Sequence, residues 1–123
     1  MSADDLTILD EQLLLRRIHP QWIANGEPES SNFDAKRSDD GLSVTLWVDE
    51  SSIAYLLAGH EDFGISVLTA GDLRQEGFII ERAPMPDNPH HCDAVGPVAQ
   101  KSSKRLRQKH RWLKKPGEAI LDL

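Results

Sequence analysis

The chain has 123 residues, of which 39% are apolar and 28% are charged, and its formal net charge is −6. With a mean hydropathy of −0.45, this composition excludes a disordered chain, and no apolar run approaches the ~18 residues of a membrane-spanning helix. The first ten residues are acidic, unlike the basic start and apolar core of a signal peptide. We therefore expect one cytoplasmic domain over residues 1–123.

Charge is distributed unevenly along the chain. Residues 1–100 carry a net charge of −12, whereas residues 101–123 carry +6. All eight Lys and Arg residues of the last segment lie between Lys101 and Lys115, with no acid among them. Such a segment can meet nucleic-acid phosphates, an acidic protein partner, or the acidic body of the same chain.

The first 41 residues predict one strand and one long loop. The opening leucines have a spacing that also fits a helix, but we favour a strand at about 12–18, because Pro20 disfavours helix at His19. From Asn25 to Gly41 the chain is rich in Gly, Pro, Ser, Asn and Asp, which is typical of a loop.

The middle of the chain alternates strand and helix signals. Apolar and polar residues alternate over 42–48, which predicts a strand. A helix should follow, capped by Asp49 or Ser51 and ended by Gly59. Similar patterns predict a strand at 63–69, a short helix at 69–77, and strands at 78–82 and 91–98. The fold class is α+β: a mixed sheet of four to five strands, two short helices and a C-terminal basic helix.

A basic helix is expected at about 103–114, between a capping Ser102 or Ser103 and the stop signal Pro116-Gly117. An apolar stripe of Leu106 and Leu113 would dock it. Its candidate partner-binding residues are Lys104, Arg105, Arg107, Lys109, Arg111, Trp112 and Lys114. Phosphate binding by counterion release, binding to an acidic protein, and docking onto the acidic body all explain these residues.

A second candidate region is the run Pro-His-His-Cys-Asp at 89–93. Adjacent residues of a strand point to opposite faces, so His90 and His91 cannot both join the other ligands around one ion. We predict no metal site and no cofactor. Cys92 has the context of a small buried apolar residue, although a thiolate nucleophile activated by the histidines is the alternative.

The third candidate region is the end of the first strand. Arg16, Arg17 and His19 could grip a phosphate or a carboxylate, because arginine offers a bidentate fork. The structural alternative is that one arginine pairs with a neighbouring acid and His19 with a loop carbonyl. If the chain is an enzyme, this loop and the segment of His90 and His91 should form two walls of one pocket.

Four segments resemble a group of small bacterial proteins that have no assigned activity. The segments are Arg-Arg-Ile-His-Pro at 16–20, Ser-Ser-Asn-Phe at 30–33, Leu-Ser-Val at 42–44 and Pro-Asp-Asn-Pro-His-His at 86–91. This resemblance implies a bacterial cytoplasmic protein with a compact domain. It implies no activity, cofactor or catalytic residue.

The chain is also similar to compact ADP-ribosyltransferase-like enzymes, which place an Arg or His on an early strand, a Ser on the next strand and often a Glu on a late strand. The matching residues are Arg17 or His19, Ser43, and Glu118. The likeness implies that Arg or His holds a dinucleotide and that Glu stabilises positive charge on the ribose. The second strand departs from the pattern, reading Leu-Ser-Val-Thr where these enzymes often have Ser-Thr-Ser.

The sequence shows no convergent catalytic set, and its basic C-terminal segment stands apart. We therefore expect a non-catalytic bacterial interaction or regulatory module, an accessory subunit that binds an acidic protein or a nucleic acid and no membrane. The alternative is a small enzyme whose pocket is built from the 16–19 loop and the segment of His90 and His91.

Overall fold

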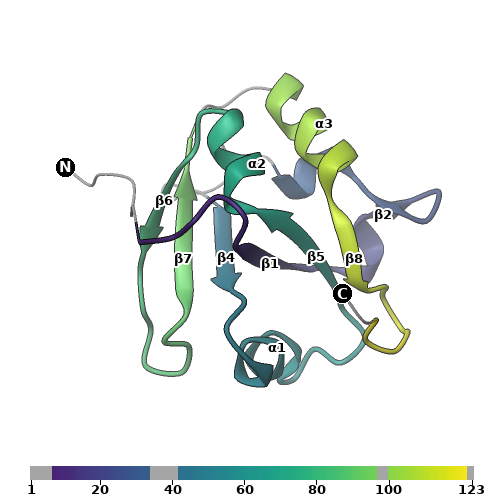
Figure 1. The fold of residues 1–123 in the computed structure, drawn as a ribbon. Helices are drawn as coiled ribbons and strands as arrows, with labels where there is room; N and C mark the ends of the chain where they lie inside the picture. Colours follow the sequence, from purple (N-terminus) through teal and green to yellow (C-terminus); the bar gives the residue numbers. More distant parts are fainter. Residues whose placement is uncertain (1–6, 34–41, 97–99, 122–123) are drawn as a thin grey trace.

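A computed structural model describes residues 7–33, 42–96 and 100–121 of the chain. Its main feature is a six-stranded sheet in the order β6-β7-β4-β1-β5-β8 (Figure 1). The strands are β1 (Leu13–Ile18), β4 (Leu42–Leu46), β5 (Gly64–Thr69), β6 (Ile79–Arg82), β7 (His91–Val95) and β8 (Arg111–Lys114). All five neighbouring pairs are antiparallel, so the expectation of a mixed sheet with four to five strands is corrected, while the α+β class is confirmed.

A second, two-stranded sheet lies across the start of the segment, residues 25–41, that the composition predicted to be a loop. It consists of β2 (Ile23–Ala24) and β3 (Glu27–Pro28), flanked by the short 3-10 helices η1 (Pro20–Trp22) and η2 (Ser30–Phe33). Asn25 and Gly26 join the two strands with φ values of 56° and 79°. Asn-Gly is the residue pair that favours a two-residue hairpin turn with positive φ at both positions, so a local signal accounts for this hairpin.

The first two helices begin where their capping residues predict. Helix α1 (Glu50–Leu57) is capped by Asp49, whose carboxylate accepts hydrogen bonds from the Ser51 hydroxyl and backbone N–H, and both bonds lower the pKa of Asp49. Helix α2 (Ala70–Gln75) begins with a capping box between Thr69 and Asp72. Within the described ranges, no helix is long and apolar enough to cross a membrane.

The C-terminal segment differs from its prediction. Helix α3 spans Gln100–Lys109, His110 forms the junction, and residues 111–114 form β8 along the free edge of β5 (Figure 1). The expected helix over 103–114 is therefore corrected to a helix followed by a strand. Extended pairing satisfies backbone groups of β5 and buries Leu113 against Ile65 and Val67, contacts that a continued helix would forgo.

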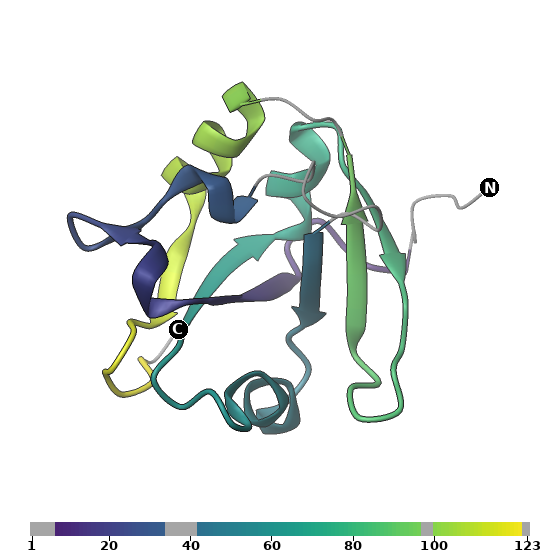
Figure 2. The same ribbon diagram turned by 180° about the vertical axis from the view of Figure 1, so that it is seen from behind.

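The core lies on both faces of the sheet. Leu14 belongs to a cluster with Leu73 of α2 and Leu106 of α3, whereas its neighbour Leu15 belongs to a cluster with Ile53 of α1. Adjacent strand residues point to opposite faces, so α2 and α3 cover one face and α1 lies on the other (Figures 1 and 2). β1 is thus buried on both sides near its start.

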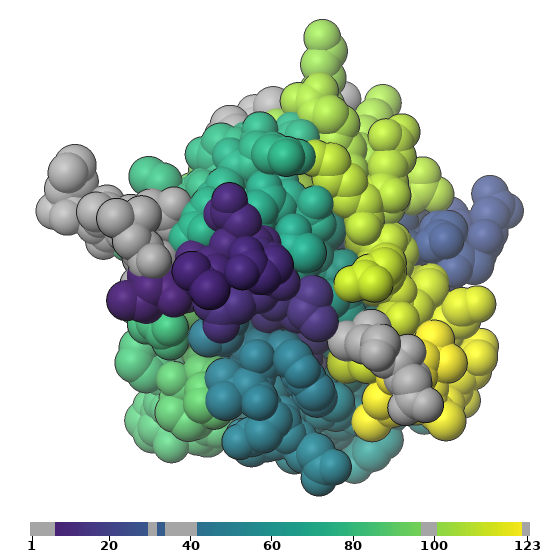
Figure 3. All heavy atoms as spheres, in the orientation of Figure 1, coloured from purple at the N-terminus to yellow at the C-terminus, as the bar shows by residue number. Residues whose placement is uncertain are grey.

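The beginning of the described chain lies against α2 (Figure 3). The Gly71 N–H donates to the Asp10 carbonyl at 2.8 Å, and Arg74 forms an ion pair with the Asp10 carboxylate at 2.7 Å. These contacts cover the start of α2.

Candidate functional site

A cavity of about 440 Å³ opens where β1 and β4 separate. The two strands are paired only at Leu14–Leu46 and Leu15–Thr45, after which β1 turns away from β4 (Figure 2). The side chains of Arg16 and Arg17 line the space that this divergence leaves. Helix α1, the η1 turn and the start of β7 supply the other walls.

Arg16 spans the gap between the separating strands. Its Nε donates to the Asn32 carbonyl at 2.5 Å and one terminal nitrogen donates to the Ser43 carbonyl at 2.9 Å. No carboxylate forms an ion pair with it in the part of the chain that the structure describes. Burial and the nearby charge of Arg17 lower the pKa of Arg16 to about 10, so the group remains a cation at neutral pH.

Arg17 follows Arg16 on β1, and its side chain reaches the end of α1 from the same cavity. Its guanidinium donates to the Leu56 carbonyl at 3.3 Å and lies 5.7 Å from the centroid of the Phe63 ring. A helix C-terminus and an aromatic face both carry partial negative charge, which holds the guanidinium in place without neutralising it. Arginine has five N–H donors, and most of those of Arg17 have no partner among the described residues.

The two histidines that line the cavity have different hydrogen-bonding roles. His19 Nδ1 accepts from the Gln21 backbone N–H at 3.0 Å, so a neutral His19 ring carries its proton on Nε2. His91 Nδ1 lies 3.0 Å from the Ala83 carbonyl, which only accepts, so Nδ1 carries the proton. A neutral His91 ring therefore presents Nε2 as an acceptor, 3.8 Å from Asp93 Oδ1.

Asn88 fixes the connection that carries His91 to the site. Its buried side-chain amide donates to the Thr45 hydroxyl at 3.0 Å, and its side-chain oxygen accepts from the His90 backbone N–H at 3.2 Å. Thr45 and Ser43 are alternate residues of β4 and both line the cavity. The β6–β7 connection is thereby held at the edge of the pocket.

The cavity lining is cationic in an acidic protein. Two arginines and two histidines line it, and none of the chain's 20 Asp and Glu residues is among the lining side chains that the structure describes. A second cavity, beside α2, shows the opposite character, with Asp10, Glu11 and Asp72 around Arg74. A recess lined by one sign of charge concentrates ions of the other sign, so the first cavity favours anions.

The candidate catalytic residues divide between the cavity and other regions. Arg17, His19, Ser43 and His91 all line the cavity, which brings the 16–19 loop and His91 together as the pocket interpretation required. His90 precedes β7 and is not among the lining residues, as expected for neighbours that point in different directions.

Glu118 does not join the ADP-ribosyltransferase-like set. It follows β8 at one edge of the sheet, and β5 and β1 lie between that edge and β4, which carries Ser43. It is not among the residues that line the cavity. The expected convergence of these residues with Glu118 is therefore corrected. Arg17, His19 and Ser43 line one cavity, and Glu118 does not.

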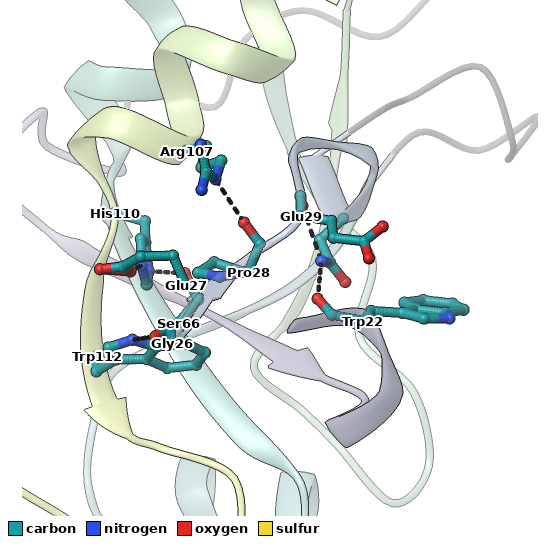
Figure 4. A network of polar contacts seen from close by, with 10 residues as sticks. Trp22, Gly26, Glu27, Pro28, Glu29, Ser66, Arg107, His110 and Trp112 are labelled. Atoms are coloured by element: carbon teal, nitrogen blue, oxygen red, sulfur yellow. Dashed lines mark hydrogen bonds and ion pairs between the residues drawn. The ribbon is translucent and has the colours of Figure 1, made fainter. Parts of the chain in front are cut away.

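Three of the seven residues proposed for partner binding project from α3 onto the body of the protein. Arg105 donates to the buried Glu76 carboxylate at 2.7 Å, and Lys109 lies 3.6 Å from the same carboxylate. Burial raises the pKa of Glu76, but hydrogen bonding and charge from Arg105 and the charge of Lys109 lower it further, so its pKa is below the ordinary value. Arg107 donates to the Pro28 carbonyl at 2.7 Å (Figure 4).

Two further residues of that set lie on β8 and are also engaged. Trp112 Nε1 donates to the Gly26 carbonyl at 3.3 Å (Figure 4), and the buried Lys114 donates to the Phe63 carbonyl at 2.7 Å. Lys104 and Arg111 are exposed, and their side chains have no hydrogen bond to another described residue. Docking onto the body of the same chain thus accounts for five of the seven side chains.

The structure adds a positioning residue that the sequence did not single out. The buried Asn32 side chain donates to the Trp22 carbonyl at 3.1 Å and to the Glu29 carbonyl at 2.8 Å, while its backbone carbonyl accepts from Arg16. An asparagine in a polar loop carries no periodic signal, and only tertiary contacts reveal this role.

Cys92 is buried in the core with Val44 and Ala94, which supports the interpretation as an apolar residue. Across residues 7–33, 42–96 and 100–121, no three His, Cys, Asp or Glu side chains are placed to hold a metal ion together.

No protein-family model, curated protein or solved structure matches the chain.

Proposed function

We propose that this protein is a binding module for a small phosphorylated molecule, whose phosphoryl group is held between Arg16 and Arg17. The observation that carries the proposal is the half-buried Arg16 cation, which has two carbonyl partners and no carboxylate partner among the described residues. Burying a charge is costly unless an opposite charge or strong hydrogen bonds compensate it. An anionic ligand would supply the missing compensation.

The charge of the site favours a phosphoryl group over a carboxylate. Two guanidinium groups match the charge of a phosphate monoester, which is close to −2 at neutral pH, whereas a carboxylate carries one charge. Guanidinium forks also match the geometry of phosphate oxygens. His19, whose neutral ring carries its proton on Nε2, adds a further donor to the lining.

The exposed basic surface of the C-terminal segment is the weaker candidate. Contacts within the chain already engage four of its eight Lys and Arg side chains, and Lys101, Lys104, Arg111 and Lys115 are the exposed cations whose side chains have no hydrogen bond to another described residue. The interaction with an acidic protein or a nucleic acid that the sequence suggested therefore has less support than ligand binding in the cavity.

The proposal is limited to binding. Among the described lining residues, no hydroxyl or thiol lies within hydrogen-bond distance of a histidine ring, which is the arrangement that nucleophilic catalysis uses. A ligand-binding accessory or regulatory module agrees with this geometry better than the small enzyme does.

Titration with inorganic phosphate and with phenyl phosphate, followed by calorimetry and by amide NMR shifts, tests the proposal. We expect Arg17→Gln to weaken binding by about tenfold or more, because hydrogen bonds to charged groups contribute roughly 1.5–3 kcal/mol each. Arg17 is chosen because its side chain makes one hydrogen bond to the fold, whereas that of Arg16 makes two.

The matched control is Arg111→Gln, which removes the same charge from an exposed position on β8. It should change the affinity by less than about twofold, because an exposed distant charge is screened by salt. Failure of the wild-type protein to bind either probe, or equal losses in the two variants, would overturn the proposal.

A further inference from the structure

Aromatic side chains line the same cavity as the arginines. Three of the chain's seven Phe, Trp and Tyr residues do so: Trp22, Tyr55 and Phe63. They come from three different elements, the η1 turn, α1 and the segment before β5. Cationic and aromatic groups therefore meet in one recess.

Trp22 has a fixed main chain and an open ring. Its backbone N–H donates to the His19 carbonyl at 3.0 Å, and its carbonyl accepts from the Glu29 N–H at 3.0 Å and from the Asn32 amide at 3.1 Å. Yet the residue is 48% exposed, and Figure 4 shows the indole pointing away from this polar network. A large apolar ring held in this way offers a preorganised surface for stacking.

The other rings form the support of this surface. Phe63 has contacts with Arg17, with His19 at 4.8 Å between ring centroids, and with His60 at 4.7 Å. His19 also contacts Trp22, with centroids 5.8 Å apart, and it is the only ring against Trp22 in the described part of the chain. Phe63 and His19 are thus engaged within the protein, while Trp22 retains aromatic surface for a ligand.

The size of the cavity also favours an organic ligand over a bare inorganic anion. Its volume of about 440 Å³ lies within the range of roughly 300–1,000 Å³ that is typical of pockets for organic ligands. A bare inorganic anion would contact the guanidinium groups and leave the aromatic walls in water.

We infer that the ligand is a phosphomonoester whose organic part is a planar aromatic ring, as in a nucleoside monophosphate or an aryl phosphate, with the ring stacked on Trp22 and the phosphoryl group between Arg16 and Arg17. This inference rests on the proposed function and adds the class of ligand.

The test compares probes of equal charge that differ in the ring. Phenyl phosphate and adenosine monophosphate carry an aromatic ring, whereas glycerol phosphate and ribose 5-phosphate do not. We expect each aromatic probe to bind about tenfold more tightly than its non-aromatic counterpart, since stacking on an aromatic side chain commonly contributes a factor of this order. A preference confined to one of the two pairs identifies the ring as aryl or nucleobase.

Variants of Trp22 test ring stacking separately from phosphoryl binding. Trp22→Ala should reduce the preference for aromatic probes to about twofold or less, while Trp22→Phe should retain most of the preference. Trp47→Ala, which removes an indole from a different cavity, should have no effect on the preference.

The outcomes distinguish the two proposals. If the wild-type protein binds glycerol phosphate and phenyl phosphate equally well, the inference about the ring is wrong and the phosphate site stands. A ring preference that survives in Trp22→Ala also overturns the assignment to Trp22. If no probe binds, inorganic phosphate included, the proposed function itself is wrong.

Discussion

Ser66 Oγ lies 2.9 Å from His110 Nδ1, inside the protein where β5 meets the junction of α3 and β8. The opposite ring nitrogen of His110 lies 3.0 Å from Glu27 Oε2 on the β2–β3 hairpin (Figure 4). A carboxylate only accepts, so Nε2 carries a proton toward Glu27, and a neutral ring then accepts from the Ser66 hydroxyl at Nδ1. Because Ser66 is only 1% exposed, the arrangement connects three elements and gives no substrate access to the hydroxyl.

We predict that His110→Ala destabilises the protein by about 1–3 kcal/mol, because it leaves the buried Ser66 hydroxyl without a partner and removes the ring that fills the junction. Urea unfolding measures this loss. Adding Ser66→Ala to His110→Ala should recover part of it, because the unpaired hydroxyl is then absent. A double variant that is less stable by the full sum of the single effects would contradict this assignment.

The pair of Arg105 and Glu76 predicts a dependence of stability on pH. Arg105→Gln should reduce the free energy of unfolding at pH 7 by about 0.5–1 kcal/mol, because one partner of the pair is half exposed to solvent. Urea unfolding at several pH values measures the difference between the two proteins. Arg111→Gln, which removes an exposed arginine on β8, is the control and should lie within about 0.5 kcal/mol of the wild type.

The sign of this dependence follows from the Glu76 carboxyl group. Its pKa in the folded protein is below the ordinary value of 4.5, so the folded state binds fewer protons than the unfolded state. The stabilisation is fully present above pH 4.5 and is lost as the pH falls through the lower folded-state pKa. The deficit of Arg105→Gln should therefore shrink in acid, and a deficit that grows in acid would show that another interaction is responsible.

Gly64 provides a steric prediction at the start of β5. A Cβ atom built on Gly64 would lie 2.8 Å from Trp112 Cζ3 and 2.9 Å from Pro116 Cδ, closer than carbon atoms approach in proteins. Gly64→Ala should therefore destabilise the protein by about 1–3 kcal/mol, the usual cost of overpacking a filled site. Thermal unfolding measures this. Gly59→Ala, at a left-handed position with φ of 73° and open space around it, should cost about 1 kcal/mol through the backbone alone.

Asn32 is expected to affect both stability and ligand binding. Asn32→Ala removes the two hydrogen bonds to the Trp22 and Glu29 carbonyls from a buried position, which should cost about 1–3 kcal/mol in urea unfolding. It should also weaken phosphate binding, because the Asn32 backbone holds Arg16. Gln108→Ala, at an exposed position of α3, is the control and should change neither property. Normal affinity in Asn32→Ala would remove its positioning role.

Local interactions made much of the fold predictable. The caps at Asp49 and Thr69 depend on side chains that bond backbone groups two or three residues away, so the starts of α1 and α2 follow from the sequence. The alternation over Leu42–Leu46 likewise predicts β4, because one face of the strand is buried in the core. The Asn25-Gly26 hairpin belonged to the same class of local signal.

The strand β8 could not be predicted in this way. Helix spacing of Leu106, His110 and Leu113 continues smoothly through residue 114, and nothing nearby in the sequence stops it before Pro116. The strand forms because β5, more than 40 residues earlier, has an open edge that pairs with residues 111–114. Because this segment is a strand, the side chains of Trp112 and Lys114 donate hydrogen bonds to carbonyls of the same chain and are not available to a partner.

Several residues of the site could be named as candidates from the sequence, but their position around one cavity could not be predicted. The sequence by itself determined that two arginines and a histidine end the first strand, in a stretch, residues 12–26, that contains no Asp or Glu. Only the tertiary structure decided that β1 separates from β4 after Leu15, and that His91 and Trp22 close around the gap. Caps and alternation depend on neighbours in the chain, whereas a cavity depends on strand order, which long-range hydrogen bonding and burial select.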